Sequence, residues 1–213
     1  MTRDAVTIDE LVVGDDPEAW RAAGFTMDGD VCRVGKLSFR LAGTVGGRGI
    51  LGWSLAGLDK AMTDVDGVPT SGTAADDSEA PEHPNGIVSV DHVVLATPHL
   101  ARTQRALAAL GWEPRRERDG RMGDAPVRQV FYRPGGVILE VVGDPEATGD
   151  GPSSLWGVTF TVTDIEAAAG RFGSAASPIR DAVQPGRKIL TLRHRELGLS
   201  LRSALMTPHV RPD

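Results

Sequence analysis

The stretch VDHVVLATPHLARTQRALAALGW, from Val90 to Trp112, decides the fold of this chain. It reads as a β-strand rich in Val and Leu, a polar turn with Pro98, and an amphipathic helix that stops at Gly111. A second stretch, LWGVTFTVTDIEAAAGRFG at residues 155–173, has the same order. Aligning His92 with Gly157 places His99 on Asp164 without a gap. The chain therefore carries a duplicated unit, and neighbouring repeats of this kind bury a shared core.

The sequence after each helix completes a β-α-β-β-β unit. In the unit 87–145, strands are predicted at 113–119, 127–133 and 137–142. In the unit 154–208, they are predicted at 177–183, 187–195 and 199–206. The expected fold class is α+β, with tandem modules forming one curved, cupped mixed sheet and helices on its outer face. We therefore assign residues 87–213 to one domain of two modules.

The first 58 residues look like a weaker copy of the same unit. TIDELVVG aligns with SVDHVVLA, which places Glu10 at the position of His92 and predicts that Ser54 corresponds to Glu140. Residues 59–86 are rich in Gly, Pro, Asp, Ser and Ala and are predicted to be a linker. Because the units pair two by two, an odd number of three leaves the first unit without a partner unit in the chain. We therefore expect a homodimer through this unit, or its folding back on the pair.

Composition excludes several classes of protein. The chain has 213 residues and a net charge of −6, which disfavours nucleic-acid binding. It lacks a membrane-length apolar run and a secretory h-region, so neither a membrane partner nor export is expected. Cys32 is the only cysteine, which rules out a disulfide within the chain and favours a cytoplasmic location. The glycine-rich GTVGGRG lacks a GK[ST] ending, so no nucleotide cofactor is expected.

A basic cluster interrupts this acidic chain at Arg115, Arg116, Arg118 and Arg121. One interpretation is a solvated strand edge that charge protects from aggregation. The other is a positively charged surface that binds an anionic substrate such as a carboxylate or phosphate.

Strand alternation predicts which side chains face the inside of the cup. Val93 and Leu95 should face the helix, which leaves His92 on the inner surface. The same rule sends Glu140 inward from the strand 137–142. In the unit 154–208, the inner positions are Gly157, Thr159, Thr161, Ser200 and Arg202. An inward His and an inward Glu in one unit are a candidate site, because an unpaired buried carboxylate is costly.

These residues resemble the vicinal oxygen chelate superfamily, which includes glyoxalases, bleomycin-resistance proteins and extradiol dioxygenases. The resemblance rests on residues 90–112, on VILEVV at 137–142, and on the repeated β-α-β-β-β order. It implies a small-molecule site between two modules. It also implies a divalent metal held by a first-strand His or Gln and a last-strand Glu from each half, so that His92 and Glu140 match one half.

The unit 154–208 departs from the family's pattern, since Gly157 stands at the first-strand ligand position and Arg202, or Ser200, at the last-strand position. Two protein ligands would hold one divalent ion weakly, and Arg202 favours an anion or an ion pair with Glu140. We therefore expect a small-molecule-binding glyoxalase-like protein with an incomplete metal site, its ligand held by Thr159, Thr161, Ser200 and Arg202. The alternative is a divalent-metal-dependent lyase, isomerase or dioxygenase that uses His92 and Glu140, with Glu140 as ligand or proton shuttle. The sequence leaves open whether the protein is an enzyme.

Overall fold

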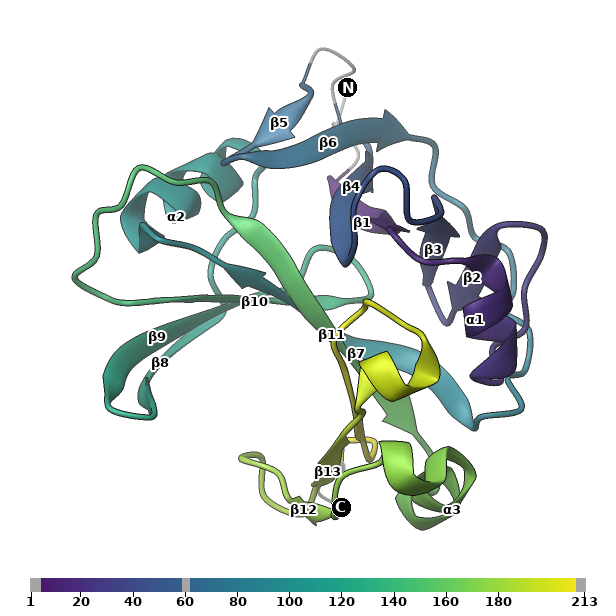
Figure 1. Ribbon diagram of the computed structural model, residues 1–213. Coiled ribbons are helices and arrows are strands. Elements are labelled where there is room, and N and C mark those ends of the chain that lie inside the picture. The colour runs from purple at the N-terminus through teal and green to yellow at the C-terminus, as the bar shows by residue number, and fades with distance from the viewer. Residues whose placement is uncertain (1–4, 59–61, 210–213) are drawn as a thin grey trace.

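The computed structural model describes residues 5–58 and 62–209, and they form two sheets (Figure 1). The larger sheet has eight strands in the order β12-β13-β14-β11-β7-β10-β9-β8. One half of it comprises β7 (Ile87–Ala96), α2 (Leu100–Ala109), β8 (Arg116–Met122), β9 (Ala125–Tyr132) and β10 (Ile138–Gly143). The other comprises β11 (Ser154–Val162), α3 (Ile165–Phe172), β12 (Arg180–Asp181), β13 (Lys188–Thr191) and β14 (Ser203–Met206). Two single-turn 3-10 helices, η1 (Gly173–Ala175) and η2 (His194–Leu197), lie in the second half.

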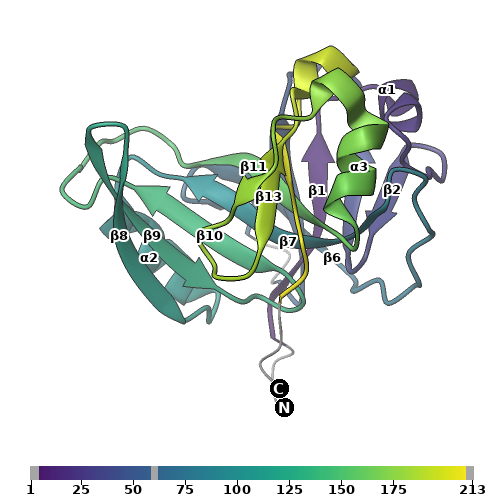
Figure 2. The ribbon, with the colours of Figure 1, turned by 90° about the horizontal axis from the view of Figure 1, so that it is seen from below.

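This sheet confirms the predicted fold class. In each half the last strand pairs parallel with the first, and β7 and β11 join the halves antiparallel. The sheet curves, and helix α3 lies against its outer face (Figure 2). Asp164 caps α3 through a hydrogen bond from the Ala167 N–H, as the sequence position before an apolar helix suggests. Among the described residues, no helix is long and apolar enough to cross a membrane.

The smaller sheet has six strands in the order β2-β3-β1-β4-β6-β5. Its elements are β1 (Thr7–Val13), α1 (Pro17–Ala22), β2 (Val31–Val34), β3 (Leu37–Leu41), β4 (Ile50–Ala56), β5 (Asp64–Val65) and β6 (Val68–Thr73). Strand β3 pairs parallel with β1, β4 pairs antiparallel with β1, and β6 pairs parallel with β4. The order repeats that of the larger sheet with one strand fewer in each half.

The chain therefore contains four related units, where the sequence suggested three. Residues 59–86, expected to be a linker, carry the β5–β6 hairpin, which completes a second half-unit with β4. The prediction that Ser54 corresponds to Glu140 was wrong, because β4 is the counterpart of β11 and β3 is the counterpart of β10. The first unit also has a mate within the chain, so the homodimer prediction loses its premise, and the oligomeric state stays a prediction.

The outer faces of the two sheets pack against each other through aromatic side chains. Phe160 of β11 lies 5.7 Å, between ring centroids, from both Phe25 and Phe39. Trp53 of β4 meets Trp112, just after α2, edge to face at 5.8 Å. These rings belong to one continuous buried core. The first unit thus folds back on the pair, as one of the two sequence-based alternatives predicted, and both inner faces point away from this core.

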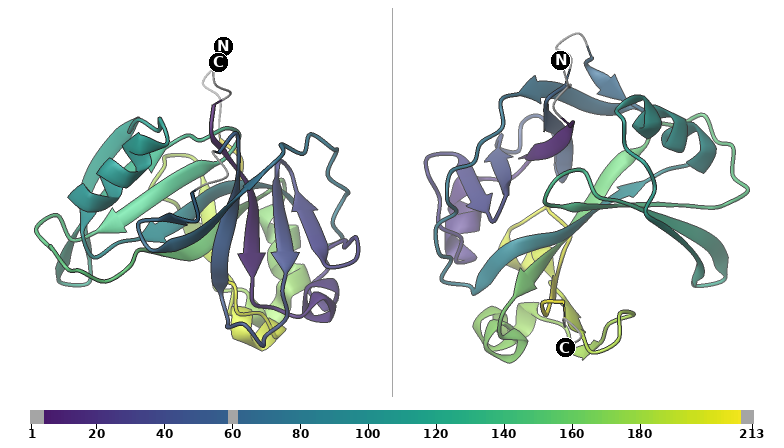
Figure 3. Two further views of the ribbon diagram at one scale, coloured as in Figure 1. Left: turned by 90° about the horizontal axis from the view of Figure 1, so that it is seen from above. Right: turned by 180° about the vertical axis from the view of Figure 1, so that it is seen from behind.

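The segment between β6 and β7 runs past β2 and β3 (Figure 3). His83 of this segment hydrogen-bonds to the backbone of β2. The His83 ring is buried: its Nδ1 accepts from the Thr26 N–H at 3.0 Å, and its Nε2 lies 3.0 Å from the Arg33 carbonyl. A ring that accepts at Nδ1 and donates at Nε2 is the neutral tautomer. Burial lowers the pKa of His83, and the hydrogen bond to Arg33 offsets this only in part.

The turn of the β5–β6 hairpin joins the two sheets through Asp66. Asp66 and Gly67 both have positive φ, 54° and 88°, as a type I′ Asp-Gly turn requires. The Asp66 carboxylate, which is almost fully buried, accepts hydrogen bonds from Arg102 and Thr103 of α2 and from Ser153. The turn residue that the hairpin needs is therefore also the residue that ties the smaller sheet to α2.

The pH dependence of stability should report on His83. Because its folded-state pKa is lowered, the unfolded chain binds the additional proton first as the pH falls below the ordinary value of 6.5. We expect the free energy of unfolding in urea to fall between pH 7.5 and pH 5.5. The variant His83→Asn should be less stable at pH 7.5 and show a weaker pH dependence over this interval. An unchanged pH dependence in the variant would contradict the assignment.

Removing the Asp66 carboxylate should weaken the junction between the sheets. We expect Asp66→Ala to lower the free energy of unfolding by about 3 kcal/mol, because a partly buried arginine and two hydroxyl groups lose their shared acceptor. The control Asp64→Ala removes an exposed carboxylate that accepts one N–H, from Gly67, and should cost about 1 kcal/mol or less. Asp66→Asn, which tolerates positive φ, separates loss of charge from backbone strain. Equal losses in Asp66→Ala and Asp64→Ala would refute the role given to Asp66.

Candidate functional site

The inner face of the larger sheet holds His92 and Glu140 side by side. Val93 and Leu139 are fully buried on the outer face, so the alternation of β7 and β10 turns their neighbours inward. The Nε2 atom of His92 lies 3.4 Å from Oε2 of Glu140. The two side chains are 13% and 10% exposed, so both reach the surface of the inner face while remaining largely buried.

A β-bulge adds Asp91 to this pair. In the β7–β11 ladder, His92 pairs with Thr159 and Val90 pairs with Phe160, so Asp91 has no partner and the alternation is interrupted. Its carboxylate therefore reaches Nδ1 of His92 at 2.8 Å. Its other oxygen accepts from Arg187 at 2.5 Å. Burial alone would raise the pKa of Asp91, but the hydrogen bonds from His92 and Arg187 outweigh it and lower that pKa from 3.8 to about 2.

The other side of the pair is held by neighbouring strands β9 and β8. Gln129 of β9 donates from Nε2 to Oε1 of Glu140. Arg118 of β8 donates to the Oε1 atom of the same amide, with its Nε at 2.8 Å. Arg118 thus hydrogen-bonds to Gln129, which in turn hydrogen-bonds to Glu140. Strand β8 is an edge strand, as the first interpretation of the basic cluster expected, and its inner-face residues include Arg116 and Arg118; the binding of an anionic substrate there stays a prediction.

Among the described residues, the second half of the sheet places no acidic or imidazole side chain opposite this pair. Thr159 lies across the ladder from His92, and both Thr159 and Thr161 are largely buried. Gly157 faces Val94, and a Cβ there would lie 2.8 Å from the carbonyl oxygen of Arg202. The close approach of β11 to the residue before β14 therefore leaves no room for a side chain at the position where the family resemblance places a ligand.

The structure does not bring two predicted residues to the pair. Arg202 stacks its guanidinium over the exposed Trp156 ring, 5.2 Å from the ring centroid. Among the residues that the structure describes, no ion pair joins Arg202 to Glu140. Ser200 accepts from the Gly49 N–H at 2.6 Å and its own N–H donates to Asp15, so it lies at the junction with the smaller sheet.

The donor set does not fit a complete metal site. His92 Nε2 and Glu140 Oε2 are adjacent, and the Asp91 contact to Nδ1 resembles the outer-shell carboxylate that orients a metal-bound His. Catalytic zinc sites, however, use three protein ligands, and the third is missing because Gly157 cannot carry one. Within residues 5–58 and 62–209, no group of three or more His, Cys, Asp or Glu side chains is placed to hold a metal ion.

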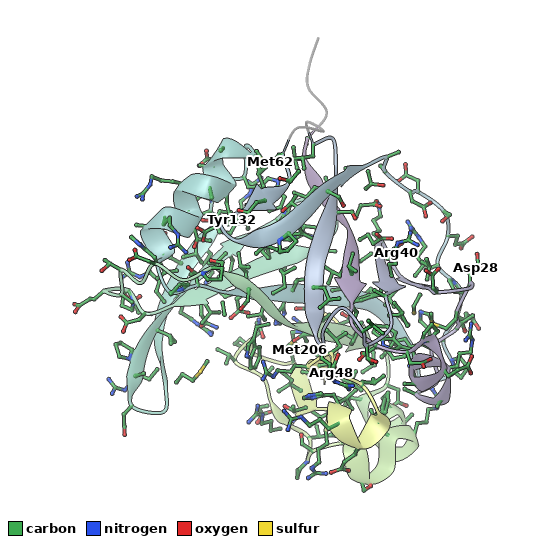
Figure 4. All side chains as sticks on the ribbon, turned by 45° about the horizontal axis from the view of Figure 1, so that its top comes forward. Asp28, Arg40, Arg48, Met62, Tyr132 and Met206 are labelled. Atoms are coloured by element: carbon green, nitrogen blue, oxygen red, sulfur yellow. The ribbon has the colours of Figure 1, made fainter. Side chains whose placement is uncertain are left out.

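The smaller sheet has an ion pair at the equivalent position. Glu10 pairs with Ser38 as His92 pairs with Ile138, so Arg40 occupies the position of Glu140. Arg40, labelled in Figure 4, holds Glu10 through two contacts, at 2.9 and 3.2 Å. Asp9 is bulged out of the β1–β4 ladder just as Asp91 is bulged out of β7–β11. The two sheets share the backbone feature but only the larger one presents an acid and an imidazole.

Two cavities lie away from His92 and Glu140. One of about 950 Å³ lies beside the end of α2, around Trp112 and Arg133, and extends to residues next to 1–4 and 59–61. Another of about 530 Å³ lies between β1, β2 and the segment 75–80, where Arg33 pairs with Asp76. Neither contains residues of the inner face of the larger sheet, so we base the candidate site on its convergent polar groups.

Sequence reasoning missed Asp91, Gln129 and Arg187. Alternation assigns Asp91 to the outer face, and only the bulge turns it inward. The one sequence signal was the shared Asp of SVDHVVLA and TIDELVVG, which marks the same bulge in both sheets. Arg187 is 96 residues from Asp91 in a turn, and no local pattern connects them.

Comparison with known proteins confirms the predicted fold. No protein-family model matches this sequence, and no curated protein matches it. Among solved structures, a triple mutant of 4-hydroxymandelate synthase from Streptomyces coelicolor is 14% identical, with a TM-score of 0.62 over 98% of this chain and 94% of that one. Homoprotocatechuate 2,3-dioxygenase from Arthrobacter globiformis is 15% identical, with a TM-score of 0.61 over 99% and 83%. A catechol 2,3-dioxygenase is 11% identical, with a TM-score of 0.61 over 97% and 96%.

The steric explanation for Gly157 predicts the effect of adding a methyl group. We expect Gly157→Ala to lower the free energy of unfolding by about 1–3 kcal/mol, because the new Cβ meets backbone that cannot move without disturbing β14. Gly170→Ala in α3 is the control, since a Cβ there meets nothing and alanine favours the helix by up to about 1 kcal/mol. Urea denaturation of both variants measures the difference. A neutral Gly157→Ala would show that the missing ligand has another cause.

Proposed function

From the vicinal oxygen chelate fold of this chain, we propose that the protein binds a small molecule on the inner face of the sheet formed by residues 87–208. The site is centred on His92 and Glu140, with Thr159 and Thr161 on the facing strand. An anionic group of the ligand would be drawn toward the β8 edge by the exposed Arg116. The proposal includes a cytoplasmic location and no nucleotide cofactor.

The observation that carries this proposal is the approach of His92 Nε2 to Glu140 Oε2 at 3.4 Å. One polar atom of each side chain already has a hydrogen-bond partner. Nδ1 of His92 contacts Asp91, and Oε1 of Glu140 accepts from Gln129. The two atoms that face each other are therefore the ones left for a ligand. Buried polar groups in proteins are normally satisfied, so an arrangement with spare hydrogen-bonding capacity at the surface of a cupped face favours binding.

An imidazole beside a carboxylate can also move a proton. If the ligand presents an acidic C–H or O–H between these atoms, either group is placed to accept the proton and return it. Such catalysis needs no residue from the second half of the sheet. It would make the protein an enzyme of the proton-transfer kind, with Glu140 or His92 touching the reacting atoms.

A metal-dependent lyase, isomerase or dioxygenase that uses His92 and Glu140 is the second candidate. It is favoured by one observation, the Asp91 carboxylate at His92 Nδ1, which is the contact that metal-bound His residues usually make. It is disfavoured by the two-ligand donor set, since a divalent ion would then depend on water or substrate for the rest of its shell. A metal bound this way would supply Lewis-acid activation of a ligand oxygen.

Binding of defined probes separates the candidates. We expect benzoate or inorganic phosphate to raise the Tm of the wild-type protein in a concentration-dependent way, and Glu140→Gln and His92→Gln to change that shift. Glu146→Gln, an exposed carboxylate in the loop after β10, is the control and should behave as wild type. If neither probe nor an uncharged aromatic such as catechol shifts the Tm, the small-molecule site on this face is refuted.

Metal analysis of the same proteins decides between the two candidates. After purification without chelator, we expect less than one equivalent of any divalent metal, at the same level in wild type and in His92→Ala. One equivalent in the wild type that is lost in both His92→Ala and Glu140→Gln would establish the metal-dependent candidate instead.

A further inference from the structure

The second half of the larger sheet contributes a buried arginine to the site. Arg187 lies in the turn between β12 and β13, and its side chain is 1% exposed. Its guanidinium donates to Asp91 Oδ1 at 2.5 Å and, from Nε, to the Thr207 carbonyl at 2.8 Å. It also lies 3.3 Å from Nε2 of His209, which accepts because arginine has no acceptor. Three contacts from two segments fix this guanidinium in place.

Asp91 connects this arginine to the imidazole of His92. One of its oxygens is taken by Arg187 and the other lies 2.8 Å from His92 Nδ1. An ionised carboxylate only accepts hydrogen bonds, so Nδ1 of His92 must carry a proton. Asp91 is 4% exposed in its side chain, which leaves it no alternative partner in water. The orientation of the carboxylate, and hence of the ring, depends on Arg187.

We propose that Arg187 is a positioning residue of the site and acts through Asp91 to hold His92 with its proton on Nδ1. The inference rests on the proposed function for its importance to a ligand, but the tautomer is a property of the protein alone. Because Asp91 takes the proton on Nδ1, the other ring nitrogen, Nε2, is the one that points toward Oε2 of Glu140, 3.4 Å away. Two acceptors at that distance repel unless a donor or a cation lies between them. A hydroxyl group of the ligand, which donates to one acceptor through its hydrogen, would bridge these two atoms when the ring carries its proton on Nδ1 alone.

The equivalent bulge residue of the smaller sheet, Asp9, has different partners, and this contrast supports the role of Arg187. Asp9 occupies the same bulge as Asp91, but there the next residue is Glu10, which pairs with Arg40. No imidazole needs orienting in that sheet, and the Asp9 carboxylate instead accepts from the backbone N–H of Asp76. The bulge is thus common to both sheets, whereas among the described residues only Asp91, beside the histidine, accepts a hydrogen bond from an arginine at this position.

Nitrogen-15 NMR of the His92 ring at a fixed pH of 7.5 tests the proposal directly. The ring signals are identified by their loss in His92→Gln. We expect the wild-type proton on Nδ1. In Asp91→Asn the amide oxygen faces Arg187 and the NH2 group, a donor, faces His92, so Nδ1 must accept, and we expect the proton to move to Nε2 while the protein stays folded. Arg187→Met should also lose the single Nδ1-protonated form, and Arg187→Lys should restore it in part.

Arg180→Met, an exposed arginine of the same hairpin, is the matched control and should keep the wild-type ring signals. If Arg187→Met does not fold, Asp91→Asn and Arg187→Lys still decide the matter. A wild-type ring without a proton on Nδ1, or ring signals unchanged in both Asp91→Asn and Arg187→Met, would overturn the proposal.

Binding of inorganic phosphate or catechol, the two probes that carry an O–H donor, provides the second measurement. Loss of the positioning contact should weaken it about tenfold or more in Arg187→Met, the range seen when outer-shell partners of a site are removed. Ring signals that respond as expected, with no probe bound by any variant, would leave this inference standing and refute the proposed function. A probe bound equally by wild type and Arg187→Met would refute the inference and leave the proposed function standing.

Discussion

The antiparallel pairing of β7 with β11, and the bulge at Asp91 within it, is the constraint on which the rest of the structure depends. The pairing joins two half-sheets into one curved surface and sets Thr159 opposite His92. The bulge turns Asp91 from the outer face to the inner one, where its carboxylate lies between His92 and Arg187. Without the extra residue, a buried aspartate would point into an apolar core beside Val93, where no charged partner is available.

The same bulge at Asp9 shows that the two sheets are variations on one backbone plan. Each pairs its first strand parallel with the last strand of its own half and antiparallel with the first strand of the next. They differ in what occupies equivalent positions: an ion pair between Glu10 and Arg40 in one, His92 and Glu140 in the other. The smaller sheet covers the outer face of the larger one through Phe39 and Trp53.

The inner face of the larger sheet is asymmetric for a physical reason. The first half supplies the acid and the imidazole, and the second half approaches too closely at Gly157 to supply a side chain there. Its contribution comes instead from the β12–β13 turn, by way of Arg187. Arg118 holds the opposite end of the network through Gln129. Two arginines at the ends of a line of hydrogen-bonded side chains keep the central pair in one geometry, which is the preorganisation that a binding or proton-transfer site requires.

Sequence by itself determined the duplicated unit, the α+β fold class and the inward direction of His92 and Glu140. These follow from local rules: alternation along a strand, helix periodicity and the turn residues that end each element. Tertiary structure alone decided that residues 64–73 add strands to the smaller sheet, that Arg40 and not Ser54 matches Glu140, and that Asp91 links Arg187 to His92 by hydrogen bonds. A bulge breaks the alternation on which the sequence rules rely, and a contact between residues 96 positions apart depends on how distant segments pack, which no local pattern encodes.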